Sequence, residues 1–159
     1  MPVETVFTIG VYGSTENDFF SKLVDNRIDL FIDIRRRRAV RGSKYSFVNS
    51  KRLQQKLQEL SIPYQHIIDL APSNTIRGLQ KQKDKSEGVL KSQRTELSND
   101  FVREYKKDIL DLYDLSDIVI KSHYKRIVFF CVEKEPRACH RSIVTEEIGK
   151  TFGINISHI

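Results

Sequence analysis

The chain has 159 residues, of which 39% are hydrophobic and 30% are charged, and its formal net charge is +6 at pH 7. This length and composition fit a single domain over residues 1–159 with its own hydrophobic core. No apolar run approaches about 18 residues, which argues against a transmembrane helix, and the N-terminus lacks the pattern of a secretory signal. We therefore expect a cytoplasmic protein without membrane contact.

The first half of the chain predicts three strands separated by helical or irregular segments. Each predicted strand is a short apolar run, as expected for a buried strand. Ser14 or Thr15 is expected to cap a helix after the first strand, and Ser50 a helix whose leucines recur at helical spacing. The segment 35–49 has no such period and is predicted to be a loop. The three strands are residues 6–11, 28–34 and 64–70.

Residues 71–98 have the least regular pattern of the chain. They are polar, contain Pro72, Gly78 and Gly88, and lack the periodic apolar positions of a core element. Long segments of this kind are usually functional or mobile. We expect a lid-like insertion around 71–98, with room for one short helix.

The last part of the chain predicts a helix, a strong strand, a second helix and a final strand. The first helix is expected to begin at Ser98 or Asn99 and to reach about residue 113. The second covers 140–152 and ends at Gly153. The strand over residues 126–132 is apolar on both faces, which places it in the middle of a covered sheet. The two strands are residues 126–132 and 154–159.

The alternation of strands and helices predicts a three-layer α/β fold, in which a mostly parallel sheet of about five strands carries helices on both faces. Ligands bind beyond the carboxyl ends of the strands in such sheets. We expect polar residues that are distant in sequence to converge on this edge. The residues concerned are Gly10 and Gly13, Asp33 and Arg35, His66 to Asp69, and Cys131 to Arg141.

Several motifs at these strand ends occur together. They are Thr8-Ile9-Gly10 with Gly13, Asp33-Ile34-Arg35, Ser43 with Phe47, Tyr64 with His66, Cys131-x-Glu133 followed by Pro136-x-x-Cys139-His140-Arg141-Ser142, and His158. Together they resemble the domain of unknown function 488 family, over most of the chain. The resemblance implies a compact α/β domain and supplies no settled activity. The chain departs from the family at residues 69–72, where a Leu-Gly-Gly is usual.

Positive charge is concentrated in residues 35–58, which contain nine Lys or Arg and no Asp or Glu. Such segregation favours a polyanion as partner, either a nucleic acid or a phosphorylated small molecule. A solvated surface without a partner is the alternative. Tyr45 and Phe47 would either stack on bases or anchor this loop on the core. The candidate nucleic-acid contacts are Arg36, Arg37, Arg38, Arg41, Lys44 and Tyr45.

The Cys-His-Arg segment lies at a predicted helix start, where backbone N–H groups attract anions and lower the pKa of a thiol. Cys139 is therefore a candidate nucleophile, with His140 or His66 as base, and Asp33 is a candidate base or orienting group. The alternative is structural packing of Cys139, with Arg141 paired to a carboxylate. The candidate anion-binding residues are Arg35, Arg141, Ser142, Gly10 and Gly13, and Glu133 is a candidate orienting residue.

Two other kinds of site are not expected. Cys131 and Arg137 have the spacing of a phosphatase loop, but the residues between them include two glutamates and Pro136, which do not suit a phosphate cradle. A metal site with Cys131, Cys139 and His140 is disfavoured, because adjacent Cys and His side chains do not readily aim at one ion from a helix start. We expect neither a metal nor another cofactor.

These features favour an enzyme that acts on a phosphorylated or nucleotide-like substrate. A nucleic-acid-binding module without catalysis is the alternative, and a partner-binding domain with a structural Cys-His-Arg segment is a third hypothesis. The reaction itself does not follow from the sequence.

Overall fold

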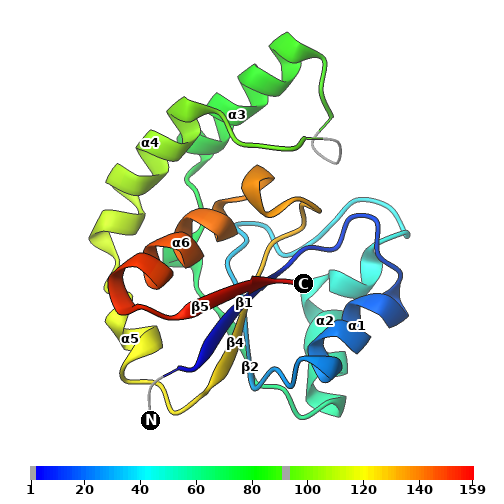
Figure 1. Cartoon of the computed structure of the whole chain (residues 1–159). Helices are drawn as coiled ribbons and strands as arrows, with labels where there is room; N and C mark the ends of the chain where they lie inside the picture. Colours follow the sequence, from blue (N-terminus) through cyan, green and yellow to red (C-terminus); the bar gives the residue numbers. More distant parts are fainter. Residues whose placement is uncertain (1–2, 91–93) are drawn as a thin grey trace.

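The computed structural model describes residues 3–90 and 94–159 and contains a five-stranded sheet in the order β3-β2-β4-β1-β5 (Figure 1). Every pairing in this sheet is parallel. The predicted α/β fold with a mostly parallel sheet is therefore confirmed. The strands are β1 (Thr5–Ile9), β2 (Leu30–Asp33), β3 (Tyr64–His66), β4 (Arg126–Phe130) and β5 (Asn155–His158).

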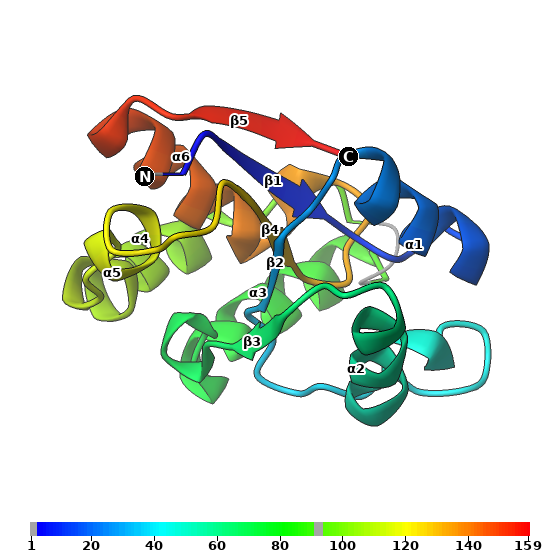
Figure 2. The same cartoon turned by 90° about the horizontal axis from the view of Figure 1, so that it is seen from below.

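Helices cover both faces of the sheet, which gives three layers (Figures 1 and 2). One face is covered by α1 (Glu16–Asp25) and α2 (Ser50–Glu59), whose buried side chains pack on the phenylalanines of β1, β2 and β4. The other core lies under the remaining helices and contains the alternate residues of the same strands. These helices are α3 (Asn74–Glu87), α4 (Asn99–Asp108), α5 (Ser116–Val119) and α6 (His140–Phe152).

The boundaries of several elements follow the predicted signals. Thr15 caps α1 by accepting a hydrogen bond from the backbone N–H of Asp18, and Ser98 caps α4 in the same way. The helix α6 has its predicted limits and ends at Gly153, whose φ of 67° is left-handed. The predicted cap of α2 is one residue off, because Ser50 is already helical and Asn49 occupies the cap position.

The predicted insertion around 71–98 contains more regular structure than we expected. Its main element is α3, a helix of 14 residues that begins after the capping side chain of Ser73 and ends at Gly88, where φ is 66°. The expectation of a single short helix was wrong because the caps and the contact with α4 stabilise a helix whose sequence is almost wholly polar. Residues 91–93 of this segment lie outside the described residues.

All five strands and the helix after Ser98 are shorter than predicted. The strand β3 ends at His66, because a 3-10 turn over Ile68–Leu70 follows it. The long helix after Ser98 ends at Asp108 and is followed by a 3-10 turn over Leu110–Leu112 and by the short α5.

The connections from β1 and β4 leave these neighbouring strands in opposite directions. The chain passes from β1 through α1 to β2, and from β4 through α6 to β5, on the other face. Ligands often bind at such a switch point. Here the two loops are joined by their backbones, because the N–H groups of Val11 and Tyr12 both donate to the Val132 carbonyl at 3.0 Å.

Among residues 3–90 and 94–159, no helix is long and apolar enough to span a membrane.

Candidate functional site

Asp33 and Arg35 form a buried ion pair at the end of β2. The Arg35 side chain donates from Nε to Asp33 Oδ1 at 2.9 Å and from Nη2 to Oδ2 at 2.8 Å. Its guanidinium also lies 4.7 Å above the ring of Phe130, and Nη2 donates to the Val48 carbonyl. The pair therefore anchors the loop that follows β2 to the sheet, although among the described residues Arg35 Nη1 is buried without a hydrogen-bond partner.

Tyr64 and Arg38 extend this pair into a chain of hydrogen bonds. The Tyr64 hydroxyl donates to Asp33 Oδ2 at 2.7 Å and accepts from Arg38 Nη1 at 3.5 Å. Burial and then the charge of Asp33 raise the pKa of Tyr64 to about 12, and the hydrogen bond to Tyr64 raises the pKa of Arg38. The phenol therefore stays protonated at neutral pH and holds the carboxylate in place.

Two histidines bind consecutive carbonyls at the end of β2. His66 contacts the Arg35 carbonyl through Nε2 at 2.7 Å, and His140 contacts the Ile34 carbonyl through Nε2 at 2.7 Å. A carbonyl oxygen can only accept, so each Nε2 carries a hydrogen, and Nδ1 is the ring nitrogen that is left for another partner. The structure thus brings His66, His140, Asp33 and Arg35 to one edge of the sheet.

Cys131, Cys139 and His140 form a buried cluster beside this edge. The two sulfurs and one ring nitrogen all lie within 4.8 Å of one another. The hydrogen bond with Cys139, and then burial, raise the pKa of Cys131 to about 11. Burial lowers the pKa of His140, but the charge of Cys131 and the hydrogen bonds to Cys131 and to the Ile34 carbonyl outweigh it, so that the net shift is upward.

This cluster corrects one step of the sequence reasoning. We expected adjacent Cys139 and His140 not to aim at one point, yet they do. Cys139 is extended, with φ of −137° and ψ of 146°, and its thiol turns back to accept from the backbone N–H of Arg141 at 3.5 Å. His140 then starts the helix and directs its ring toward β2, so the geometric objection to a metal at this cluster was wrong.

Arg141 makes contacts within the chain, and its predicted contact with an anion stays a prediction. Its guanidinium is 1% exposed and donates to the carbonyls of Glu133 at 2.6 Å and of Lys134 at 3.2 Å. It therefore holds the connection between β4 and α6. The hydroxyl of Ser142 donates to the Cys139 carbonyl at 2.9 Å, so its hydrogen is also engaged within the helix start.

The two predicted glycines serve close contacts between loops. A Cβ on Gly10 would lie 1.9 Å from the carbonyl oxygen of Glu133, so only glycine fits there. Gly13 has a φ of +84° and donates its N–H to the Tyr45 hydroxyl at 2.8 Å. Among the described residues, these contacts account for both glycines without a ligand.

Glu133 binds a partner that the sequence reasoning missed. Its carboxylate pairs with Arg94 Nη2 at 2.7 Å, and Arg94 Nη1 pairs with Asp84 on α3 at 2.8 Å. The side chain of Arg94 is 10% exposed and also donates to the Ala138 carbonyl. The predicted orienting role of Glu133 is therefore directed to Arg94, and together they tie the end of α3 to the loop after β4.

A guanidinium cluster, which consists of Arg36, Arg37 and Arg77, lies at the same edge of the sheet. Arg36 donates from Nε to the Pro72 carbonyl at 2.6 Å, which joins the loop after β2 to the start of α3. Arg77 is half-buried on α3, and burial and then the charge of Arg37 lower its pKa, with Arg36 acting in the same direction. Arg77 is not among the candidate contacts predicted from the sequence.

Some of the predicted nucleic-acid contacts in the basic loop after β2 are exposed to solvent, and others are half-buried. Arg37, Arg41 and Lys44 are exposed, whereas Arg36 and Arg38 are half-buried and hydrogen-bonded. Tyr45 is also half-buried, and its ring packs 5.2 Å from that of Tyr12. These contacts favour the anchoring interpretation of Tyr45 over base stacking.

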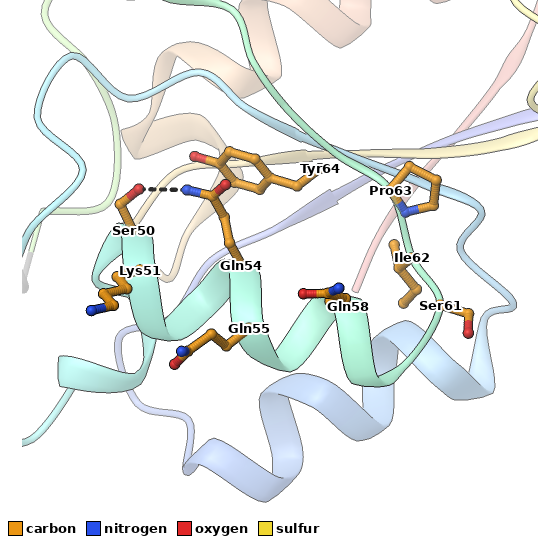
Figure 3. A pocket seen from close by; sticks show the side chains of 9 residues that line it. All are labelled: Ser50, Lys51, Gln54, Gln55, Gln58, Ser61, Ile62, Pro63 and Tyr64. Atoms are coloured by element: carbon orange, nitrogen blue, oxygen red, sulfur yellow. Dashed lines mark hydrogen bonds between the residues drawn. The ribbon is translucent and has the colours of Figure 1, made fainter.

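A separate groove runs between α2 and β3 (Figure 3). It is open, has a volume of about 900 Å³, and contains one charged residue, Lys51. Within α2, the Gln54 amide donates to the Ser50 hydroxyl at 2.8 Å. Tyr64 is the one residue that this groove shares with the chain of hydrogen bonds at Asp33.

The predicted catalytic roles of Cys139, His140, Asp33 and His66 stay predictions, since their geometry is equally that of a hydrogen-bonded scaffold. Comparison with curated proteins and with solved structures found no match. The model of one family, described as domain of unknown function DUF488, matches residues 16–148. This match covers most of the chain, including the motifs from Asp33 to Ser142, and the protein therefore belongs to the DUF488 family.

Proposed function

We propose that the protein binds a phosphate-bearing ligand at the carboxyl edge of its sheet, with the guanidinium cluster in contact with the phosphate. One observation carries this proposal: the hydrogen bond from Arg36 Nε to the Pro72 carbonyl at 2.6 Å holds the arginines after β2 against the start of α3, where their charges act on Arg77. Within the described part of the chain, none of the ion pairs involves Arg36, Arg37 or Arg77.

An anion would relieve an unfavourable arrangement in the ligand-free protein. Burial and the charges of Arg37 and Arg36 lower the pKa of Arg77 and outweigh the opposite effect of Cys131 and Glu133, so the charged form of Arg77 is disfavoured there. A phosphate between these side chains would replace repulsion by attraction. Guanidinium groups suit this task because their N–H donors match two phosphate oxygens at once.

The position of the cluster also supports a ligand site. Arg36 and Arg37 follow β2, and Arg77 lies in the first part of α3, so the cluster stands beyond the carboxyl ends of the parallel strands. Ligands of open α/β sheets bind at this edge. The net charge of +6 would steer anions toward the protein.

Calorimetric titration with inorganic pyrophosphate at low ionic strength tests this proposal. Arg77→Gln removes one charge-assisted contact, which is expected to weaken binding by roughly 10-fold to 150-fold. Arg103→Gln is the matched control, because it removes the same charge from an exposed position on α4. Equal affinity in the two variants, or no binding by the wild-type protein, would contradict the proposal.

A second candidate function is binding of a nucleic acid, in which the phosphates continue along the basic loop. The exposure of Arg37, Arg41 and Lys44 next to the guanidinium cluster favours it. A single-stranded oligonucleotide should then bind with a strong salt dependence. Replacing Arg41 and Lys44 together by glutamine is expected to reduce the slope of log K against log salt by about 1.4. An unchanged slope would exclude this loop from the contact.

A further inference from the structure

We infer that Cys131, Cys139 and His140 form a binding site for a divalent transition-metal ion of the zinc class. The three side chains are 6%, 1% and 5% exposed, and their ligand atoms lie within 4.8 Å of one another. Two sulfurs and one imidazole nitrogen are a donor set that zinc prefers. This inference does not depend on the proposed function.

The fold builds the site from two neighbouring segments. Cys131 follows the last residue of the central strand β4, whereas Cys139 caps α6 and His140 is its first residue. The site is therefore held by two rigid elements and not by a loop alone. Such support favours a preformed geometry, which lowers the cost of ligand binding.

The spacing of the ligand atoms is close to that of a tetrahedral zinc site. Zinc–sulfur bonds of about 2.3 Å and zinc–nitrogen bonds of about 2.05 Å at tetrahedral angles place S and N about 3.6 Å apart, and two sulfurs about 3.8 Å apart. The separation between Cys139 Sγ and His140 Nδ1 is 3.7 Å. A small contraction of the remaining separations would complete the site.

The surroundings orient the ligands as in known metal sites. Nε2 of His140 donates to the Ile34 carbonyl at 2.7 Å, which leaves the Nδ1 lone pair directed toward the sulfurs. Metal-binding histidines usually make such a bond through their second nitrogen. The backbone N–H of Arg141 also donates to Cys139 Sγ at 3.5 Å, which fixes the direction of this side chain.

Charge and ligand number specify the kind of site. Two thiolates would neutralise a divalent cation, so that the buried assembly of ion and ligands would carry no net charge. Among residues 3–90 and 94–159, no fourth His, Cys, Asp or Glu joins the group. An ion with three protein ligands keeps one position for water or for another small ligand, as catalytic zinc sites do.

The test is metal binding by the reduced, full-length protein. After incubation with Zn²⁺ and dialysis, the wild-type protein should retain about one equivalent, measured by elemental analysis. With Co²⁺ it should show thiolate-to-cobalt charge-transfer absorption, which requires a bound sulfur. Cys139→Ser and His140→Asn are expected to bind at least about tenfold more weakly.

The control is His66→Asn, because His66 makes the same bond to the next carbonyl of β2 but lies outside the cluster. It should retain zinc and the cobalt spectrum. The inference is overturned if wild-type protein shows no thiolate–cobalt absorption, or if His66→Asn and His140→Asn lose the metal equally. Should a variant fail to fold, the wild-type cobalt spectrum alone decides. Arg77→Gln should retain zinc in either case, which separates this inference from the proposed phosphate site.

Discussion

Replacing Asp33 by asparagine is expected to lower the free energy of unfolding by about 3–5 kcal/mol. Asp33 is fully buried and accepts four hydrogen bonds, three from Arg35 and one from the Tyr64 hydroxyl. The asparagine oxygen can keep the two contacts made by Oδ1. Its NH₂ group, however, would face the donors of Arg35 Nη2 and Tyr64. The Arg35 guanidinium, which is 3% exposed, would then remain buried without a counter-ion.

Urea unfolding, followed by circular dichroism, measures this loss. The expected loss is large against the free energy of unfolding of a whole domain, which is about 10 kcal/mol. Glu16→Gln is the control, because Glu16 forms an ion pair of similar length with Arg52, at 2.9 Å, on the exposed surface. This replacement should lower the free energy of unfolding by at most about 1 kcal/mol. The double replacement Asp33→Leu with Arg35→Met should cost less than Asp33→Asn. A cost for Asp33→Asn no larger than for Glu16→Gln would refute the structural role of the pair.

Three further predictions follow from single contacts. Gly10→Ala should destabilise the protein by about 3 kcal/mol in urea, because the new Cβ would lie 1.9 Å from the Glu133 carbonyl oxygen, and an unchanged midpoint would contradict this contact. Burial, and to a smaller extent the charge of Asp33, raise the pKa of Tyr64 to about 12. The contribution of Tyr64 to stability is therefore full below pH 10 and is lost as the pH rises toward 12, and Tyr64→Phe should remove this slope from a plot of stability against pH. Burial and a nearby arginine lower the pKa of His158 below 6.5, so stability should fall as the pH drops below 6.5, and His158→Gln should flatten this fall.

Local signals in the sequence were sufficient to predict those elements in which buried apolar residues recur at a regular spacing. The helix α6 could be predicted with its limits, because apolar residues recur along it and Gly153 ends it. The helix α3 was underestimated because only Ile76 and Gln80 are buried among its residues, so the helical period is almost absent. The strand order β3-β2-β4-β1-β5 depends on pairings between distant segments, which no local pattern specifies.

The same limit applies to the candidate site. The convergence of Asp33, Arg35, Cys139 and His140 at one edge could be predicted, since parallel strands present their carboxyl ends together. The pair of Asp33 with Arg35 is local, but most of the other partners could not be predicted, because bonds such as those from Tyr64 to Asp33 and from His140 to the Ile34 carbonyl join residues far apart in the sequence. The pair between Arg94 and Glu133, for example, joins positions that are 39 residues apart, and neither residue has a local signal that names the other.

The most direct measurement of the proposed ligand site is a crystal structure of the protein soaked with tungstate, a phosphate analogue that is located by its anomalous scattering. We predict a tungsten peak at the carboxyl edge of the sheet, with oxygens within hydrogen-bonding distance of Arg77 and of Arg36 or Arg37. A structure in which tungstate binds only elsewhere on the protein, with the guanidinium cluster still ligand-free, would contradict the account.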